Sequence, residues 1–401
     1  MRKSGINMEQ VKKENRSLII KCINNNGPLS RKDIASLTGL TAASVTQITT
    51  QLIDEKVLKE LGSVSESTGV AGRKKVLLDI NPKSSYVCSI NIESETTTIA
   101  ICDIMGNLVT PSKSTSPCIT HLKTVAHSKS GKNTHFKAAS FLAEVAKNCE
   151  ALISMLPASS KKLVKCVSVG IPGIVDKENG IAVKAYGIWD EEVPVRDILE
   201  KELTIKVPVI IENNVDAFAK AEILFGAGKA FDSLLVIKWG PGVGSTIVVD
   251  SEIYQGRHGK TAELGHFIFD KKGKLCSCGR RGCLETHISY SALTEILGVS
   301  RFEPGNLGKH YKAASFDAKK KIDNAIDLFA RSIVNTCTII APNRVVLSGS
   351  LFKDPFMRNK LITACSSYDS AYNARRLIYT SLSEKESYIG PAAVFISSSL
   401  Y

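Results

Sequence analysis

The spacing of apolar residues divides the chain into two regions of different character. Over residues 14–61, apolar side chains recur every three or four positions, as they do on one face of a helix, and the runs stop at breakers such as 24–28 and Gly39. From residue 86 onward, short apolar runs alternate with longer stretches of helical periodicity. That alternation is typical of an α/β fold. The pattern therefore predicts a small helical unit followed by a larger α/β region.

Within the α/β region, the apolar runs place individual elements. We predict buried strands at 86–92, 97–103, 165–171, 207–211, 233–238 and 344–347. Helices are expected at 136–156, 214–225, 289–296 and 317–340. Residues 110–133 are rich in Ser, Thr, Lys and His and have no apolar periodicity, so a long exposed loop is expected there.

The helical unit has the order of a helix-turn-helix. Ser30 and Thr41 stand at the N-cap positions of two short helices, and Gly39 lies in the turn between them. Residues 57–61 and 75–80 can pair as strands around a Ser/Gly-rich loop and so form a wing. The outward face of the second helix carries no Asp or Glu, and a helix that approaches DNA phosphates requires this lack of repulsion.

We therefore predict a winged helix-turn-helix that binds double-stranded operator DNA, rather than a small packing subdomain. Thr and Gln side chains can contact base edges or phosphates, and an arginine of the wing can enter the minor groove. The predicted DNA contacts are Arg31, Thr41, Ala42, Ser44, Thr46, Gln47, Arg73 and Lys74. A net charge of +13 fits a polyanionic partner, although it is equally compatible with solubility alone.

The composition also bears on location and redox state. No apolar run approaches the roughly 18 residues that span a bilayer, and the N-terminus lacks the apolar core of a signal peptide. We therefore expect a cytoplasmic protein without a membrane partner. The chain has 11 cysteines, an odd number, and most of them are scattered singly, so reduced thiols are expected.

Three cysteines that stand close together form the strongest local signal. Cys276, Cys278 and Cys283 follow His266 in the segment AELGHFIFDKKGKLCSCGRRGCLE. Three thiolates and one imidazole complete the tetrahedral shell of a structural Zn²⁺ ion. His287 is an alternative source of the nitrogen ligand, and three buried thiols beside an unrelated histidine are the reading without a metal.

With this zinc motif, residues 86–400 resemble the ROK family, which is named for repressors, open reading frames and kinases. Further support comes from VGIPGIVD at 169–176, Trp189, ENNVDAFAKAE at 212–222, the glycine loop at 240–244 and VVLSGS at 345–350. The repressor branch of the family also carries an N-terminal winged helix-turn-helix. The resemblance therefore covers nearly the whole chain.

The resemblance implies an actin-like ATPase fold of the sugar-kinase type, with two lobes and a sugar in the cleft between them. It divides the chain into the winged helix-turn-helix at 1–82, a first lobe at 83–212 and a second lobe with the zinc site at 213–401. The family pattern implies sugar contacts at Asn213, Glu263, His266 and Glu285, with Asn214 at the catalytic position. The imidazole would bind zinc through one nitrogen and offer the other to the sugar or a carboxylate.

Departures from the kinase pattern separate catalysis from binding. Active kinases of the family place an aspartate where this chain has Asn214, and an amide cannot take the proton from a sugar hydroxyl, a loss of roughly 10²–10⁴ in rate. The stretch 91–96 lacks the glycines of the first phosphate loop and carries Glu93 and Glu95, which would repel a triphosphate. In the second loop, Pro241 removes an amide donor.

The sequence therefore predicts a sugar-responsive transcriptional repressor without kinase activity. A homodimer or tetramer would present two helix-turn-helix units to the half-sites of a pseudo-palindromic operator. A monosaccharide or sugar derivative would act as the inducer. The alternatives are an ATP-dependent sugar kinase with an appended DNA-binding domain, and a regulator that answers to a protein partner instead of a sugar.

Overall fold

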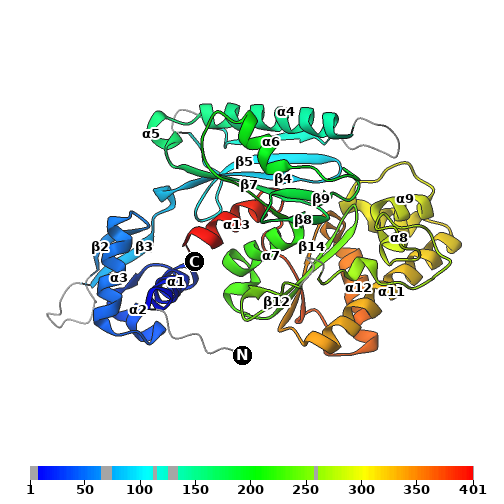
Figure 1. Cartoon of the computed structure of the whole chain (residues 1–401). Helices are drawn as coiled ribbons and strands as arrows, with labels where there is room; N and C mark the ends of the chain where they lie inside the picture. Colours follow the sequence, from blue (N-terminus) through cyan, green and yellow to red (C-terminus); the bar gives the residue numbers. More distant parts are fainter. Residues whose placement is uncertain (1–7, 65–74, 112–114, 125–133, 257–260, 401) are drawn as a thin grey trace.

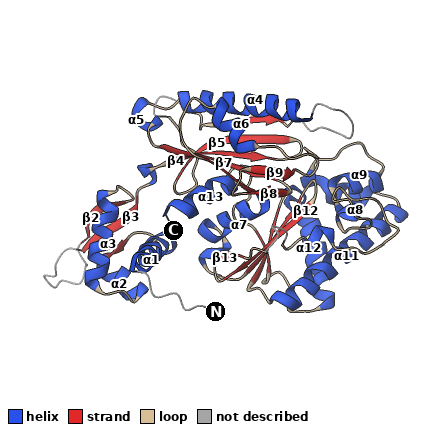
Figure 2. Ribbon diagram, viewed as in Figure 1, coloured by secondary structure: helices blue, strands red, loops and turns tan. Residues whose placement is uncertain are grey.

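The computed structural model describes residues 8–64, 75–111, 115–124, 134–256 and 261–400. Two predicted DNA contacts, Arg73 and Lys74, lie outside these ranges. Figure 1 shows a small N-terminal unit beside two larger parts, each built on a sheet. Figure 2 shows the two large sheets as separate stacks of strands, with helices between and around them. Among the described residues, no helix is both long and apolar enough to cross a bilayer.

The N-terminal unit contains three helices and a small antiparallel sheet. Its elements are α1 (Met8–Asn26), β1 (Leu29–Ser30), α2 (Arg31–Thr38), α3 (Ala42–Asp54), β2 (Leu58–Val64) and β3 (Lys75–Ile80), and the sheet order is β1-β3-β2. Ser30 forms a capping box with Asp33, and Thr41 accepts a hydrogen bond from the Ser44 amide. Gly39 adopts a φ of 71° between α2 and α3, a left-handed conformation that suits glycine. The predicted helices and strand pair are therefore present.

The first large sheet has the strand order β10-β7-β4-β5-β6. Its strands are β4 (Tyr86–Ile92), β5 (Thr96–Asp103), β6 (Ile119–Lys123), β7 (Val164–Ile171) and β10 (Val209–Asn213). Helices α4 (Thr134–Ser154) and α6 (Val195–Glu202) cover one face, and α13 (Ile389–Leu400) covers the other (Figure 1). Because β4 is central and covered on both faces, all its residues are buried. We call this sheet and its helices the first lobe.

Strand β6 corrects the prediction of a continuous loop over 110–133. Residues 119–123 pair antiparallel with β5, and Cys118 just before them is fully buried. An edge strand pairs on one side only, and most side chains of β6 are half-exposed or exposed. Polar residues such as His121 can therefore occupy it, and the apolar pattern that would reveal a strand is missing.

The second large sheet has the order β13-β12-β11-β14-β15. Its strands are β11 (Leu234–Trp239), β12 (Val243–Val249), β13 (Glu252–Ile253), β14 (Arg344–Ser348) and β15 (Leu377–Tyr379). The helices that accompany it are α8 (Glu285–Ile288), α9 (Tyr290–Leu297), α10 (Leu307–Ala313), α11 (Phe316–Ile340) and α12 (Pro355–Tyr368). We call this sheet and these helices the second lobe.

Helix α7 (Asn214–Phe225) lies between the two sheets together with α13 (Figure 2). It contacts β7 and β10 of the first lobe as well as β11 and β12 of the second. Helix α13 packs along α7 and against β4 and β7. The sequence analysis placed the C-terminal residues in the second lobe, at 213–401. The C-terminal helix instead packs against the sheet of the first lobe.

The N-terminal unit is joined to the lobes in two ways. A short 3-10 turn at Pro82–Ser84 leads from β3 directly into β4. In addition, the side-chain amide of Asn24, near the end of α1, donates a hydrogen bond of 2.6 Å to the backbone oxygen of Leu224 in α7. Asn24 is 8% exposed, and the buried Ile23 beside it belongs to the same apolar cluster as Leu224. The N-terminal unit thus contacts the helix that separates the lobes.

Candidate functional site

A pocket of about 920 Å³ opens between the two lobes. Its walls come from the end of β4, the junction of β10 and α7, the turn between β11 and β12, the cysteine-rich segment and the residues before α13. A volume of this size lies within the range of about 300–1,000 Å³ that is usual for small-molecule sites. The pocket is lined by all the predicted sugar contacts, namely Asn213, Asn214, Glu263, His266 and Glu285. The fold therefore brings these residues together in one cavity.

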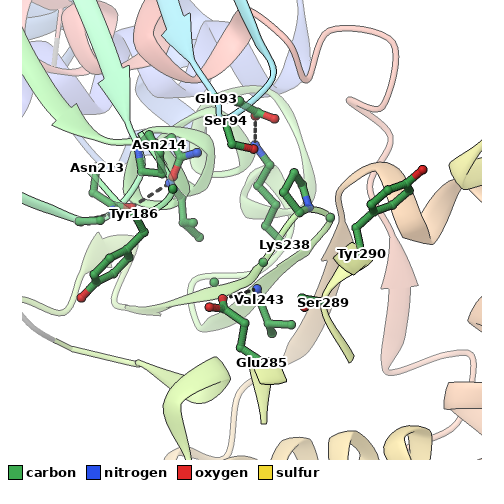
Figure 3. A pocket seen from close by; sticks show the side chains of 18 of the residues that line it. Glu93, Ser94, Tyr186, Asn213, Asn214, Lys238, Val243, Glu285, Ser289 and Tyr290 are labelled. Atoms are coloured by element: carbon green, nitrogen blue, oxygen red, sulfur yellow. Dashed lines mark hydrogen bonds and ion pairs between the residues drawn. The ribbon is translucent and has the colours of Figure 1, made fainter. Parts of the chain in front are cut away.

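Asn213 ends β10 and caps α7. Its side-chain oxygen accepts hydrogen bonds from the amides of Val215 (2.8 Å) and Asp216 (3.2 Å), and its side-chain nitrogen donates to the carbonyl of Gly173 (2.7 Å). These bonds fix the start of α7 relative to the turn after β7. Asn214 is the first residue of the helix and lines the pocket beside Asn213 (Figure 3).

Glu285 is held at the pocket wall by two donors. Its Oε2 atom accepts a hydrogen bond from the Val243 amide (3.0 Å), and its Oε1 atom accepts one from the Ser277 hydroxyl (3.3 Å). A Cβ atom on Gly242 would stand 2.5 Å from Oε2. A side chain at position 242 would therefore shift the Glu285 carboxylate from the place where it accepts the Val243 hydrogen bond. Figure 3 shows Glu285 next to the β11–β12 turn.

His266 stands between the cysteines and the pocket. Its side chain is 4% exposed, its Nδ1 atom lies 3.5 Å from the Sγ atom of Cys276, and its Nε2 atom lies 3.5 Å from the Oε2 atom of Glu263. One imidazole nitrogen therefore faces the cysteine-rich segment, while the other faces a carboxylate of the pocket.

Tyr186 is a pocket residue that the sequence did not single out. Its ring packs edge-on against His266, with 5.6 Å between the ring centroids. Burial raises the pKa of Tyr186 to about 12, and the negative charge of Glu263 acts in the same direction. The phenol is therefore neutral at physiological pH and can donate a hydrogen bond to a ligand. A single tyrosine in a turn has no sequence pattern that would have revealed it.

The side chains of His266, Cys276, Cys278 and Cys283 converge, with all their ligand atoms within 4.8 Å of one another. The sulfur atoms of Cys278 and Cys283 are 3.7 Å apart. Two thiolates on a tetrahedral Zn²⁺ ion, each at about 2.3 Å, stand about 3.8 Å apart, so the spacing fits that ion. His287 is outside this group, and its buried Nε2 atom has no hydrogen-bond partner among the described residues. The geometry therefore favours His266 over His287 as the nitrogen donor.

A second part of the pocket contains charged residues from both lobes. Glu93, just after β4, forms an ion pair with Lys238 of β11, and the Asn91 side chain donates a hydrogen bond of 3.2 Å to the same carboxylate. Lys353 and Glu386 also line this part. The sequence analysis predicted that Glu93 repels phosphate. It did not predict the contact of Glu93 with Lys238, because the two residues are 145 positions apart.

Asp216 is the carboxylate that follows Asn214 most closely, and it is already engaged. Its Oδ1 atom accepts a hydrogen bond of 2.7 Å from the Thr246 hydroxyl, and its Oδ2 atom lies 3.6 Å from the Nζ atom of Lys177. Lys177 also pairs with the buried Glu212 at 2.6 Å. These contacts hold the Asp216 carboxylate between Thr246 of the second lobe and Lys177 of the first.

The predicted DNA contacts within the described residues fall into two groups. Those on α3 or at its N-cap are exposed or half-buried on one surface: Thr41, Ala42, Ser44, Thr46 and Gln47. Arg31 instead donates a hydrogen bond of 3.0 Å to Thr49 and pairs with Glu60 at 3.3 Å. Its guanidinium group is therefore engaged inside the N-terminal unit.

The chain is similar in sequence to a protein family and to several known proteins. The pattern of the ROK family matches residues 124–398. The xylose repressor of Bacillus subtilis (strain 168) is 27% identical over 400 residues, which cover 96% of each chain. The glucokinase of Thermotoga maritima is 32% identical over 216 residues, which cover 49% of this chain and 68% of the glucokinase.

Solved structures show the same fold. A ROK family transcriptional regulator, described as a homologue of the E. coli MLC protein, superposes with a TM-score of 0.74 at 23% identity and covers 98% of this chain and 97% of its own. The ROK hexokinase of Thermus thermophilus superposes with a TM-score of 0.58 and covers 78% of this chain. Since the family pattern matches well over half of its residues, the chain belongs to the ROK family.

Proposed function

We propose that this protein is a transcriptional repressor that binds operator DNA through its N-terminal unit and releases it when a sugar occupies the pocket. The extent of the similarities carries this proposal. The similarity to the xylose repressor extends over 96% of the chain, which includes the N-terminal unit, whereas the similarity to the glucokinase covers 49%. In addition, the family resemblance implies that Asn214 occupies the catalytic position, where its amide cannot act as a general base.

The N-terminal unit would bind DNA as a winged helix-turn-helix. Helix α3 follows α2 after a tight turn, and its exposed face from Thr41 to Gln51 has no acidic residue. This helix would enter the major groove, while Arg73 and Lys74 in the wing would approach the minor groove or the phosphates. A dimer or tetramer would place two such helices at half-sites about 34 Å apart.

The pocket would bind a monosaccharide or a sugar derivative. Glu263 and Glu285 offer acceptors to sugar hydroxyls, and the Nε2 atom of His266 lies beside the first of these carboxylates. A buried acceptor that lacks its partner loses about 1–3 kcal/mol, so a sugar whose hydroxyls match both carboxylates is preferred over its isomers. Asn213 and Asn214 would contact the sugar from the start of α7.

The group of His266, Cys276, Cys278 and Cys283 would hold a structural zinc ion. A closed shell of four protein ligands cross-links a segment and leaves no position for catalysis. With its Nδ1 atom bound in this way, His266 keeps its Nε2 atom directed at Glu263 in the pocket. The same segment ends at Glu285, so its order sets the position of that carboxylate as well.

Helix α7 would transmit the presence of the sugar to the N-terminal unit. Its first turn is capped by Asn213 at the pocket, and its last turn accepts the hydrogen bond from Asn24. A helix of 12 residues is about 18 Å long. Because α7 contacts strands of both lobes, a sugar that changes the angle between the lobes also moves α7 relative to at least one of them.

The proposal is tested with full-length protein, a panel of monosaccharides and a DNA fragment selected in vitro for binding. Sugars that raise the melting temperature are added to the protein–DNA complex, and fluorescence anisotropy follows the affinity for DNA. We expect one sugar to weaken DNA binding by about 5- to 150-fold per protomer, the usual range of coupling between two sites. For a dimer on one operator, the change in affinity is the square of this factor. If DNA binding is indifferent to every sugar that binds, the proposal is wrong. Steady formation of ADP from ATP and a hexose would instead establish the kinase alternative.

A further inference from the structure

Lys238 crosses the pocket from the second lobe to the first. It lies near the end of β11, and its Nζ atom contacts the Oε1 atom of Glu93, just after β4. The side chain of Lys238 is 11% exposed and that of Glu93 is 30% exposed. Figure 3 shows the lysine extended toward Glu93 and Ser94. The pair therefore ties the two lobes together inside the pocket.

Two more ionisable residues lie in this part of the pocket. Glu386 precedes α13 and Lys353 follows β14, and both line the same part of the pocket. The charges of Lys238 and Lys353 act on both carboxylates. Two carboxyl groups and two ammonium groups thus already share the space. A phosphate group would bring nearly two negative charges next to the Glu93 carboxylate, which already pairs with Lys238.

The nearby β11–β12 turn has few donors left for a phosphate. The Gly240 amide donates to the Gly242 carbonyl (3.0 Å), and the Val243 amide donates to Glu285 (3.0 Å). Pro241 has no amide hydrogen at all. A phosphate-binding loop works by directing free backbone N–H groups at the anion, and this turn has committed most of its own.

We propose that the Glu93–Lys238 pair selects the ligand: the pocket takes an uncharged sugar and excludes nucleotides and phosphorylated sugars. This inference rests on the proposed sugar-binding function and names the class of sugar. A phosphate would need Lys238 as a free cation, and Glu93 holds that cation already. The same ion pair fastens the lobes to each other without a bridging nucleotide.

The experiment looks for a gain of binding. Glu93→Gln keeps the size of the side chain, removes its charge and frees Lys238 from this ion pair. Inorganic phosphate and the ATP analogue AMPPNP are titrated calorimetrically into the full-length protein. We expect Glu93→Gln to bind both at least about tenfold more tightly than the wild type does, because one charge-assisted contact becomes available. The double variant Glu93→Gln/Lys238→Gln should lose this gain.

Glu95→Gln is the matched control. Glu95 also lines the pocket but is exposed, so the substitution removes the same charge from the rim. Equal gains in Glu93→Gln and Glu95→Gln would overturn the inference, as would a wild type that binds AMPPNP as tightly as Glu93→Gln does. If Glu93→Gln is not folded by circular dichroism, Glu93→Ser tests the same loss of charge.

The two proposals fail in different ways. The phosphate probes require no sugar, so their result stands even if no sugar affects DNA binding. Where a hexose does bind the wild type, its 6-phosphate should bind at least about tenfold more weakly. Equal affinity for the hexose and its phosphate ester would contradict the proposed selectivity and leave the sugar-responsive repressor intact.

Discussion

Replacing Asn24 by alanine should separate sugar binding from the release of DNA. Asn24 is 8% exposed and donates a 2.6 Å hydrogen bond to the Leu224 carbonyl in the last turn of α7. Carbonyl groups in the last turn of a helix have no partner within the helix. A donor from the N-terminal unit therefore satisfies one of them, and alanine removes this donor without adding bulk.

The size of the effect follows from this contact. Loss of one partner of a buried hydrogen bond costs about 1–3 kcal/mol, which equals the usual coupling free energy between two binding sites. We therefore expect the effect of sugar on DNA affinity, per protomer, to fall from about 5- to 150-fold in the wild type to within about twofold in Asn24→Ala. The affinity for sugar should be nearly unchanged, since Asn24 is not among the residues that line the described pocket.

Asn25→Ala provides the control at the adjacent position. The Asn25 side chain is exposed, and its hydrogen bond to the Lys229 carbonyl is 3.5 Å long, at the limit of such bonds. This variant should keep the full sugar response. Calorimetry measures sugar binding, and fluorescence anisotropy measures DNA binding with and without saturating sugar. A full response in Asn24→Ala would refute the role assigned to α7, and so would equal losses in both variants.

Three further predictions concern the proposed zinc ligands, the pocket and a buried carboxyl group. Cys283→Ser should lower both the zinc content and the melting temperature, whereas Ser277→Ala should keep its zinc. Inductively coupled plasma mass spectrometry measures the zinc. A Cys283→Ser protein with full zinc would count against the site. Glu285→Gln should weaken sugar binding by about tenfold or more in calorimetry, through loss of a charged acceptor, and unchanged affinity would remove Glu285 from the sugar site. Burial raises the pKa of Glu386 from 4.5 to about 7, against the opposing charge of Lys238, so the native state holds this proton more tightly than the unfolded chain does. The stability that this proton provides is present below pH 4.5 and is lost as the pH rises through 7. Glu386→Gln should therefore be more stable than the wild type by up to about 3 kcal/mol at pH 8, with a smaller gain at pH 5. Urea unfolding that shows equal gains at both pH values would contradict this account.

The sequence was most informative where structure depends on neighbours in the chain. An N-cap and the helix that it starts are adjacent, so Ser30 and Thr41 predicted α2 and α3 directly. The proposed zinc ligands were visible for a similar reason, because the three cysteines among them lie within a single short segment. The predicted sugar contacts came from the family resemblance, since neither periodicity nor charge connects Asn213 with Glu285.

Features that depend on distant segments left no such signal. Glu93 and Lys238 are each an ordinary charged residue, and only the fold brings them into contact. Asn24 stands in a run of three asparagines that reads as the end of a helix, while its partner Leu224 is 200 positions away. Edge strand β6 was missed because pairing on one side requires no apolar alternation.

The two attachments of the N-terminal unit explain how a change in the angle between the lobes can alter the orientation of this unit on the DNA. Through the turn at Pro82–Ser84, the unit continues into β4, whose residues are all buried at the centre of the first lobe. Through Asn24, it is attached to α7, which also contacts β11 and β12 of the second lobe. If α7 follows the second lobe, a rotation of one lobe against the other changes the distance between these attachments. The N-terminal unit must then turn, or the Asn24 hydrogen bond must break.

Two protomers bound to one operator would make such a small contact sufficient. To move the ratio of occupied to free operator from 99:1 to 1:99, the affinity for DNA must change by about 10⁴-fold. When two DNA-binding units of a symmetric dimer share one operator, their free energies add, so each unit must supply only about 10²-fold, or about 2.7 kcal/mol. That amount lies within the range of about 1–3 kcal/mol for one buried hydrogen bond. A symmetric assembly could therefore control its operator through the Asn24 contact of each protomer, whereas a single protomer with the same contact could not.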